Sequence, residues 1–327
     1  MRGFFTVLVD GANETMSRTV SVIGAGAMGY GFAVHFAVCG LDVTLIDHRE
    51  SNLDLARTRI RDAVEVLSKH ELTEWEPDAV VTDVDFTIDR AQGVADADVV
   101  LETVPETLEL KREVFSALAT EAPADALLAS NTSGIPITEI AAGAPSAADR
   151  IVGCHWWFPP YLLEPVEVVR GAETSDETVE RAVSFVESVD RRPIRVERDV
   201  PGFVWNRVQN AVIRECLHLV EEGVASAEDV NAAIRDGYAR RTAVVGPLET
   251  VDLAGAELFR TVAADLYPHL CTDTEPNALF DDLLADGRRG IETGRGFFDY
   301  DEPPEALLAR RDNRLAALSR CVEAFEE

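Results

Sequence analysis

Short apolar runs recur through the first 200 residues. They are separated by longer segments in which apolar residues return every three or four positions. Runs of this length alternating with amphipathic helices predict an α/β fold with a mostly parallel sheet. In the segment 51–69, one helical face is formed by Leu53, Ala56, Ile60, Ala63, Val64 and Leu67. The predicted strands are 19–23, 42–46, 98–102, 127–130, 151–154, 166–170 and 193–196.

The pattern changes near Pro201. Helical periods dominate from there to the end of the chain, for example over 203–222 and 305–326. We therefore predict an α/β domain over residues 16–200 and an all-helical C-terminal domain over residues 201–327. Residues 1–15 precede a second methionine, Met16, and carry no sustained period, so we expect them to form a loose N-terminal tail.

A glycine-rich turn follows the first predicted strand. It reads Gly24-Ala25-Gly26-Ala27-Met28-Gly29, leads into a helix, and is followed by a second strand that ends at Asp47. Strand, GxGxxG turn, helix and a terminal carboxylate form the fingerprint of a Rossmann-type dinucleotide-binding unit. The carboxylate would accept from a ribose 2′-hydroxyl and repel a 2′-phosphate, which favours NAD over NADP. The predicted NAD-binding residues are Gly24, Gly26, Ala27, Met28, Gly29 and Asp47.

The chain is strongly acidic. It has 327 residues, with 59 Asp and Glu against 30 Lys and Arg, and a formal net charge of −29. This charge repels nucleic acid and anionic membranes, so we expect neither as a partner. Only Lys69 and Lys111 are lysines. Excess carboxylate with so little lysine favours a protein adapted to a salty cytoplasm, and an acidic mesophilic protein is the alternative.

The five cysteines are Cys39, Cys154, Cys216, Cys271 and Cys321, and they show neither a CxxC motif nor Cys/His metal spacing. Scattered cysteines in odd number predict a reduced, cytoplasmic protein without a metal site. The apolar stretch 3–9 is too short to span a bilayer.

His155 is the candidate acid–base residue. It follows the predicted strand 151–154, and a Rossmann-type sheet exposes ligand-facing residues at the carboxyl ends of its strands. An imidazole can accept and return a proton near neutral pH. Glu167 lies on the next predicted strand, where a carboxylate hydrogen-bonded to the imidazole would fix its tautomer. A structural histidine and a solvated carboxylate are the alternatives.

Two further polar residues follow predicted element boundaries. Ser133 comes directly after the strand 127–130, so its hydroxyl could reach a substrate oxygen. Asn206 opens the first helix after residue 201, where its amide could do the same. A turn or helix-cap role is equally compatible with both positions.

Taken together, the motifs resemble those of the 3-hydroxyacyl-CoA dehydrogenase family. They are the glycine fingerprint, Glu102-Thr-Val-Pro-Glu106 with Lys111, Asn131-Thr-Ser133, His155 with Glu167, and Pro-Gly-Phe with Asn206-Arg207. The resemblance covers residues 18–299. It implies that His155 and Glu167 are the catalytic pair and that Ser133 and Asn206 bind the substrate oxygen. It also implies that Glu106 and Lys111 lie at the ribose and nicotinamide side of the cofactor, and that the chain forms a homodimer through its C-terminal domain.

One residue departs from the family pattern. The usual His-aromatic-aromatic-Asn-Pro is here His155-Trp156-Trp157-Phe158-Pro159, so an apolar ring replaces an amide near the reaction centre. The segment 133–137, Ser-Gly-Ile-Pro-Ile, also resembles relatives that oxidise small hydroxy acids or hydroxymethyl groups without CoA. Arg57 and Arg61 lie four residues apart on one helix face and could bind CoA phosphates, or could pair with neighbouring carboxylates such as Asp54.

Three functions are compatible with these residues. The first is an NAD-dependent L-3-hydroxyacyl-CoA dehydrogenase of fatty acid metabolism, which oxidises 3-hydroxyacyl-CoA to 3-oxoacyl-CoA with His155 as general base. The second is the same hydride transfer on a small non-CoA hydroxy acid, such as a carnitine-like, sugar-acid or aromatic hydroxymethyl compound. The third is a nucleotide-binding sensor that has lost turnover, which the presence of all four candidate site residues disfavours.

Overall fold

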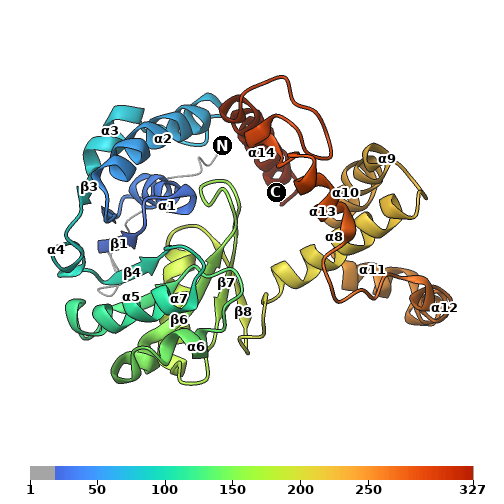
Figure 1. The fold of residues 1–327 in the computed structure, drawn as a ribbon. Coiled ribbons are helices and arrows are strands. Elements are labelled where there is room, and N and C mark those ends of the chain that lie inside the picture. The colour runs from blue at the N-terminus through green and yellow to red at the C-terminus, as the bar shows by residue number, and fades with distance from the viewer. Residues whose placement is uncertain (1–18, 327) are drawn as a thin grey trace. The chain divides into compact units, whose positions relative to one another are not determined.

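The computed structural model describes residues 19–326 and divides into two compact units (Figure 1). The first unit contains the residues up to Asn206 together with those from Leu308 onward. The second runs from Arg207 to Leu307. The predicted tail, residues 1–15, lies outside the described residues.

The first unit is built on one eight-stranded sheet with the strand order β3-β2-β1-β4-β5-β6-β7-β8. Strands β1 to β6 are parallel, β7 is antiparallel to β6, and β8 is parallel to β7. The first six strands therefore have the order of a dinucleotide-binding Rossmann sheet, as predicted. Their bounds are β1 Thr19–Ile23, β2 Asp42–Ile46, β3 Val84–Thr87, β4 Val99–Glu102, β5 Leu127–Ser130, β6 Ile151–Trp156, β7 Pro165–Val169 and β8 Arg192–Val196.

Helices cover both faces of this sheet, and each face has its own apolar core. Helices α1, α2, α3 and α7 contribute buried residues to one core, and α4, α5 and α6 contribute to the other. Burial on both faces explains why the central strands are almost continuously apolar. The bounds are α1 Ala27–Val38, α2 Glu50–Lys69, α3 Pro77–Asp83, α4 Arg90–Val94, α5 Leu108–Glu121, α6 Ile137–Ala141, the 3₁₀ helix η1 Pro145–Arg150 and α7 Asp176–Ser188.

The second unit is helical, as predicted. Over residues 19–326, no helix combines the length and apolar character needed to cross a membrane. The unit contains most of α8 Trp205–Glu221, then α9 Ala227–Ala232, the π-helical turn η2 Ala233–Tyr238, α10 Ala239–Thr242, α11 Pro247–Ala254, α12 Ala256–Leu266, η3 Tyr267–His269, α13 Ala278–Ala285 and η4 Ile291–Thr293.

The last helix, α14 Pro304–Glu326, corrects the predicted domain limits. From Leu308 onward this helix belongs to the first compact unit, and the second compact unit begins at Arg207. The reason is packing: Ala316 is fully buried in the core formed by α1, α2 and α7, and Asp312 accepts a hydrogen bond from the hydroxyl of Tyr161 at 2.9 Å. The all-helical domain is therefore shorter than the predicted 201–327.

Candidate active site

The glycine turn has the geometry that the sequence predicts. Gly24 has a φ of +103°, and a Cβ added there would lie 2.7 Å from the carbonyl oxygen of Thr103. A Cβ on Gly29 would lie 1.7 Å from the carbonyl oxygen of Gly24, so only glycine lets α1 start this close to β1. At Gly26, by contrast, nothing lies within 4 Å of an added Cβ. The N-terminus of α1 is therefore open where a pyrophosphate would bind.

Asp47 lies at the carboxyl end of β2 beside this turn. Its side chain is almost buried, at 8% exposed, and it holds the turn because Oδ2 accepts from the backbone N–H of Ala25 at 2.9 Å. Oδ1 accepts from the N–H of Arg49 at 3.0 Å and from Nδ2 of Asn52 at 2.9 Å. A carboxylate offers about four acceptor positions, so one on Oδ2 remains for a ribose hydroxyl. The residues present thus fit NAD, which, when bound, supplies the hydride acceptor.

His155 and Glu167 are direct cross-strand partners in the antiparallel pair β6 and β7. His155 Nδ1 and Glu167 Oε2 are 2.6 Å apart, which confirms the predicted contact. A carboxylate can only accept, so Nδ1 carries the proton in this hydrogen bond. The neutral imidazole therefore keeps its lone pair on Nε2, which is the atom left for exchanging a proton with a ligand.

Glu167 is fully buried, and both of its carboxylate oxygens accept hydrogen bonds. Its second oxygen, Oε1, accepts from the backbone N–H groups of Val204 at 2.8 Å and Trp205 at 2.9 Å. Burial alone would raise the pKa of Glu167, but the hydrogen bonds from His155 and from these two N–H groups outweigh it and leave the pKa lowered. The carboxylate is therefore ionised at neutral pH and stabilises a protonated His155.

Ser133 and Asn206 also come together. Nδ2 of Asn206 donates to the backbone carbonyl of Ser133, and the Ser133 side chain is exposed. Glu106 fixes the same loop by accepting from the hydroxyl of Thr132 and from the N–H of Ser133 at 2.8 Å. Burial would raise the pKa of Glu106, but its hydrogen bonds and the Lys111 ammonium leave that pKa lowered.

Lys111 is buried between two carboxylates. Its side chain is 1% exposed, and Nζ lies 2.8 Å from Glu102 Oε1 and 3.3 Å from Glu106 Oε2. Glu102, itself fully buried, also accepts from the hydroxyl of Ser130 at 2.6 Å. Lys111 therefore joins Glu102 to Glu106, the carboxylate that holds the loop at Ser133.

Aromatic rings and one cation surround the end of β6. Trp157 stacks on Trp205 with ring centroids 4.0 Å apart and an interplanar angle of 23°. The guanidinium of Arg311 lies 4.5 Å from the centroid of the Phe158 ring. Arg311 comes from α14, and sequence reasoning missed it because no local pattern links a residue of the last helix to one that follows β6.

Arg57 and Arg61, the candidate CoA contacts, are both paired with carboxylates. Nη1 of Arg57 lies 2.9 Å from Asp54 Oδ1, and its guanidinium covers the ring of Phe86 at 4.2 Å. Nε of Arg61 lies 2.7 Å from Asp78 Oδ1. The pairing of Arg57 with Asp54 confirms the alternative interpretation as surface ion pairs for that residue.

The chain matches two family models in sequence. The NAD binding domain of 3-hydroxyacyl-CoA dehydrogenase matches residues 19–200, and the C-terminal domain of the same family matches residues 202–300. A crystal structure of a 3-hydroxybutyryl-CoA dehydrogenase, PaaH1 from Ralstonia eutropha, is 30% identical, with a TM-score of 0.70, and covers 88% of this chain and 100% of its own.

Two relatives act on other compounds. The 5-formyl-3-hydroxy-2-methylpyridine 4-carboxylate 5-dehydrogenase of Mesorhizobium japonicum is 35% identical over 312 residues, which are 95% of this chain and 100% of the relative. A crystal structure of an enzyme of that name, described as an NAD⁺-dependent dismutase, has a TM-score of 0.87 and covers 94% of this chain and 99% of its own. The L-carnitine dehydrogenase of Streptomyces griseus is 39% identical over 322 residues, which are 95% of this chain and 92% of the relative. The chain is an NAD-dependent dehydrogenase and belongs to the 3-hydroxyacyl-CoA dehydrogenase family.

Proposed function

We propose that this enzyme oxidises the hydroxyl group of a small carboxylic acid that is not linked to CoA. In this reaction Nε2 of His155 takes the hydroxyl proton. Glu167 holds the imidazole in the required tautomer and stabilises its protonated form. The Ser133 hydroxyl and the Asn206 amide would orient the substrate oxygen. The two residues are in contact, because Nδ2 of Asn206 donates to the backbone carbonyl of Ser133.

The observation that carries the substrate class is the contact between Arg311 and Phe158. Phe158 stands where the family pattern has an amide, three residues after His155. Arg311 comes from α14, which lies wholly beyond residue 300, where the match to the family domains ends. The departure from the family pattern at Phe158 is thus in contact with the guanidinium of Arg311, just after the carboxyl end of β6. Nε and Nη2 of Arg311 lie 2.7 and 2.6 Å from Asp312 Oδ1, so the remaining donors of this guanidinium are the ones that we propose for a substrate carboxylate.

The CoA alternative has less support from the charges. A CoA substrate brings several phosphate charges to a chain whose net charge is −29, so it needs a local group of uncompensated cations. Arg57 and Arg61 each form an ion pair with a neighbouring carboxylate, as Arg311 does with Asp312, so the preference for Arg311 rests on its place beside Phe158 and not on a free charge. L-carnitine dehydrogenase and the pyridine carboxylate dehydrogenase, two relatives that each cover 95% of this chain, are named for small compounds without CoA.

The test measures NAD reduction by the purified chain with L-carnitine, free 3-hydroxybutyrate and 3-hydroxybutyryl-CoA side by side. We expect at least one free acid to exceed the thioester in kcat/KM. Arg311→Gln should raise the KM for that acid by roughly 10- to 100-fold, as expected for one lost charge-assisted hydrogen bond. Arg314→Gln, at an exposed position of the same helix, is the matched control. Higher kcat/KM for the thioester would overturn the proposal.

We also propose that the enzyme is a homodimer through its second unit. Within residues 207–307, the buried apolar residues are Leu217, Val230 and Cys271, whereas Leu248 is 83% exposed and Leu253 is 73% exposed. A helical unit of this size needs a larger core than that, and a second copy of the same apolar surface would supply it. Light scattering should give twice the chain mass, and a monomer at micromolar concentration would contradict this.

The five cysteines are all free, which supports a cytoplasmic location.

A further inference from the structure

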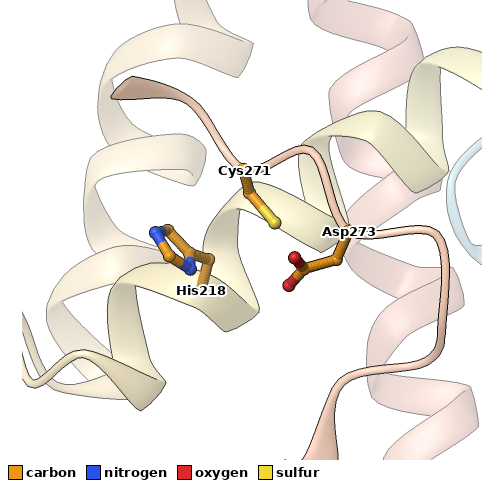
Figure 2. A group of neighbouring side chains, drawn as sticks. All are labelled: His218, Cys271 and Asp273. Carbon is orange, nitrogen blue, oxygen red and sulfur yellow. The ribbon is translucent and has the colours of Figure 1, made fainter. Parts of the chain in front are cut away.

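Three side chains with metal-binding groups converge within the second unit. His218 comes from α8, and Cys271 and Asp273 come from the loop between η3 and α13 (Figure 2). One ligand atom from each, an imidazole nitrogen, the thiol sulfur and a carboxylate oxygen, lie within 4.8 Å of one another. The sequence offers no sign of this group because 53 residues separate the histidine from the cysteine.

We propose that His218, Cys271 and Asp273 bind a Zn²⁺ ion. Zinc takes nitrogen, sulfur and oxygen ligands at about 2.0–2.3 Å in a tetrahedron, which places neighbouring ligand atoms about 3.3–3.7 Å apart. Ligand atoms at the 4.8 Å limit need to approach by about 1.1–1.5 Å to reach that geometry, which is within the reach of side-chain rotation. The mixture of a thiol and an imidazole excludes Mg²⁺ and Ca²⁺, which prefer oxygen ligands throughout.

The loop that carries two of the ligands is already positioned on α8. The backbone N–H of Cys271 donates to Glu215 Oε2 at 2.9 Å, and Nη1 of Arg214 donates to the carbonyl of Asp273 at 3.1 Å. These contacts leave the Cys271 side chain 8% exposed and directed toward His218 and Asp273 (Figure 2). The ligand groups are therefore held near one another by bonds that do not use the ligand atoms themselves.

The fourth coordination position remains available. Asp273 also lines a cavity of about 550 Å³ within this unit, together with Arg207, Asn210 and Arg214. Water or a small anion could enter from that side and complete the tetrahedron. A metal here would tie the loop to α8 in a unit with few buried apolar residues, which is the situation in which a metal adds most to folding stability.

The experiment uses the full chain, treated with a chelator and then titrated with Zn²⁺ by calorimetry. We expect one ion per chain and a melting temperature that rises with added Zn²⁺. His218→Gln and Asp273→Asn should each weaken Zn²⁺ binding by about tenfold or more. Mutating even a residue that only hydrogen-bonds to a metal ligand lowers metal affinity by at least about tenfold. Both residues are less buried than Cys271, so these variants should fold even if Cys271→Ser does not.

Matched controls come from neighbouring residues of the same chemistry, Cys216→Ser and His269→Gln, which lie outside the group. They should bind Zn²⁺ as the wild type does. With Co²⁺ in place of Zn²⁺, the wild type should show a thiolate charge-transfer band that His269→Gln keeps and Cys271→Ser loses. Absence of Zn²⁺ binding to the wild type, or equal binding by His218→Gln, Asp273→Asn and the controls, would overturn the proposal. The test reads binding and thermal stability, so its result does not depend on the substrate.

Discussion

Replacing Lys111 with methionine should cost this protein a large part of its stability. The Lys111 ammonium lies 2.8 Å from Glu102 Oε1, and the two side chains are 1% and 0% exposed. Methionine has a similar length but no charge, so the change leaves Glu102 buried without its counterion. Its remaining donors would be the N–H of Val104 at 2.7 Å and the hydroxyl of Ser130 at 2.6 Å.

The size of the effect follows from the burial. Removing one partner of a buried ion pair costs about 3–5 kcal/mol, because the other charge stays desolvated. For a domain of this size, roughly 2–4 °C of melting temperature corresponds to each kcal/mol, so we expect a decrease of roughly 6–20 °C. Adding Glu102→Gln to Lys111→Met should recover part of the loss, since the uncompensated charge is then gone.

The chain provides its own control, because Lys69 is its only other lysine and is exposed on α2. Urea and thermal unfolding, followed by circular dichroism, would compare Lys111→Met, Lys69→Met and the double variant. Lys69→Met should stay within about 0.5 kcal/mol of the wild type. Equal stability of Lys111→Met and Lys69→Met, or no recovery in the double variant, would show that the ion pair of Lys111 with Glu102 does not stabilise the fold.

Three further predictions follow from the site and the charge. Glu167→Gln should lower kcat by about 10³- to 10⁴-fold, because an amide N–H facing Nδ1 would favour the wrong imidazole tautomer. Glu164→Gln, at an exposed position, is the control. Equal steady-state rates for the two variants would contradict the role of Glu167 as the partner of His155. Asp47→Ser should raise the KM for NAD by roughly tenfold or more, as expected for one charge-assisted hydrogen bond, and an unchanged KM would show that another group binds the ribose. Lowering salt to about 0.05 M should lower the melting temperature, because screening of the −29 charge weakens, and full stability in dilute buffer would remove the proposal of a halophilic origin.

Much of the first unit could be predicted from the sequence because its signals are local. The period of the apolar residues marks seven strands, and the glycine turn sits between the first strand and α1 as expected. His155 and Glu167 could be paired because a short connection between β6 and β7 makes them antiparallel neighbours. The missed strand, β3, is four residues long at the edge of the sheet and has only Val84 fully buried, so its alternation is weak.

The remainder depends on contacts between distant parts of the chain. The sequence places α14 in the helical domain because its period is helical, but nothing local shows that Asp312 reaches Tyr161, 151 residues earlier. Arg311 therefore reaches Phe158 without any pattern to predict it. Lys111 stands in a motif shared with the family, and only the fold shows that two carboxylates enclose it.

His155→Ala tests the central claim most directly, in a single comparison of turnover and NADH affinity. As the proposed general base, His155 would act on the proton of the substrate and not on the cofactor, so we predict that kcat falls by about 10²- to 10⁴-fold. The Kd for NADH, measured by fluorescence titration of the same preparation, should stay within about twofold of the wild type, because the NAD-binding residues of the glycine turn and Asp47 are unchanged. Retained turnover by His155→Ala would show that another group takes the proton.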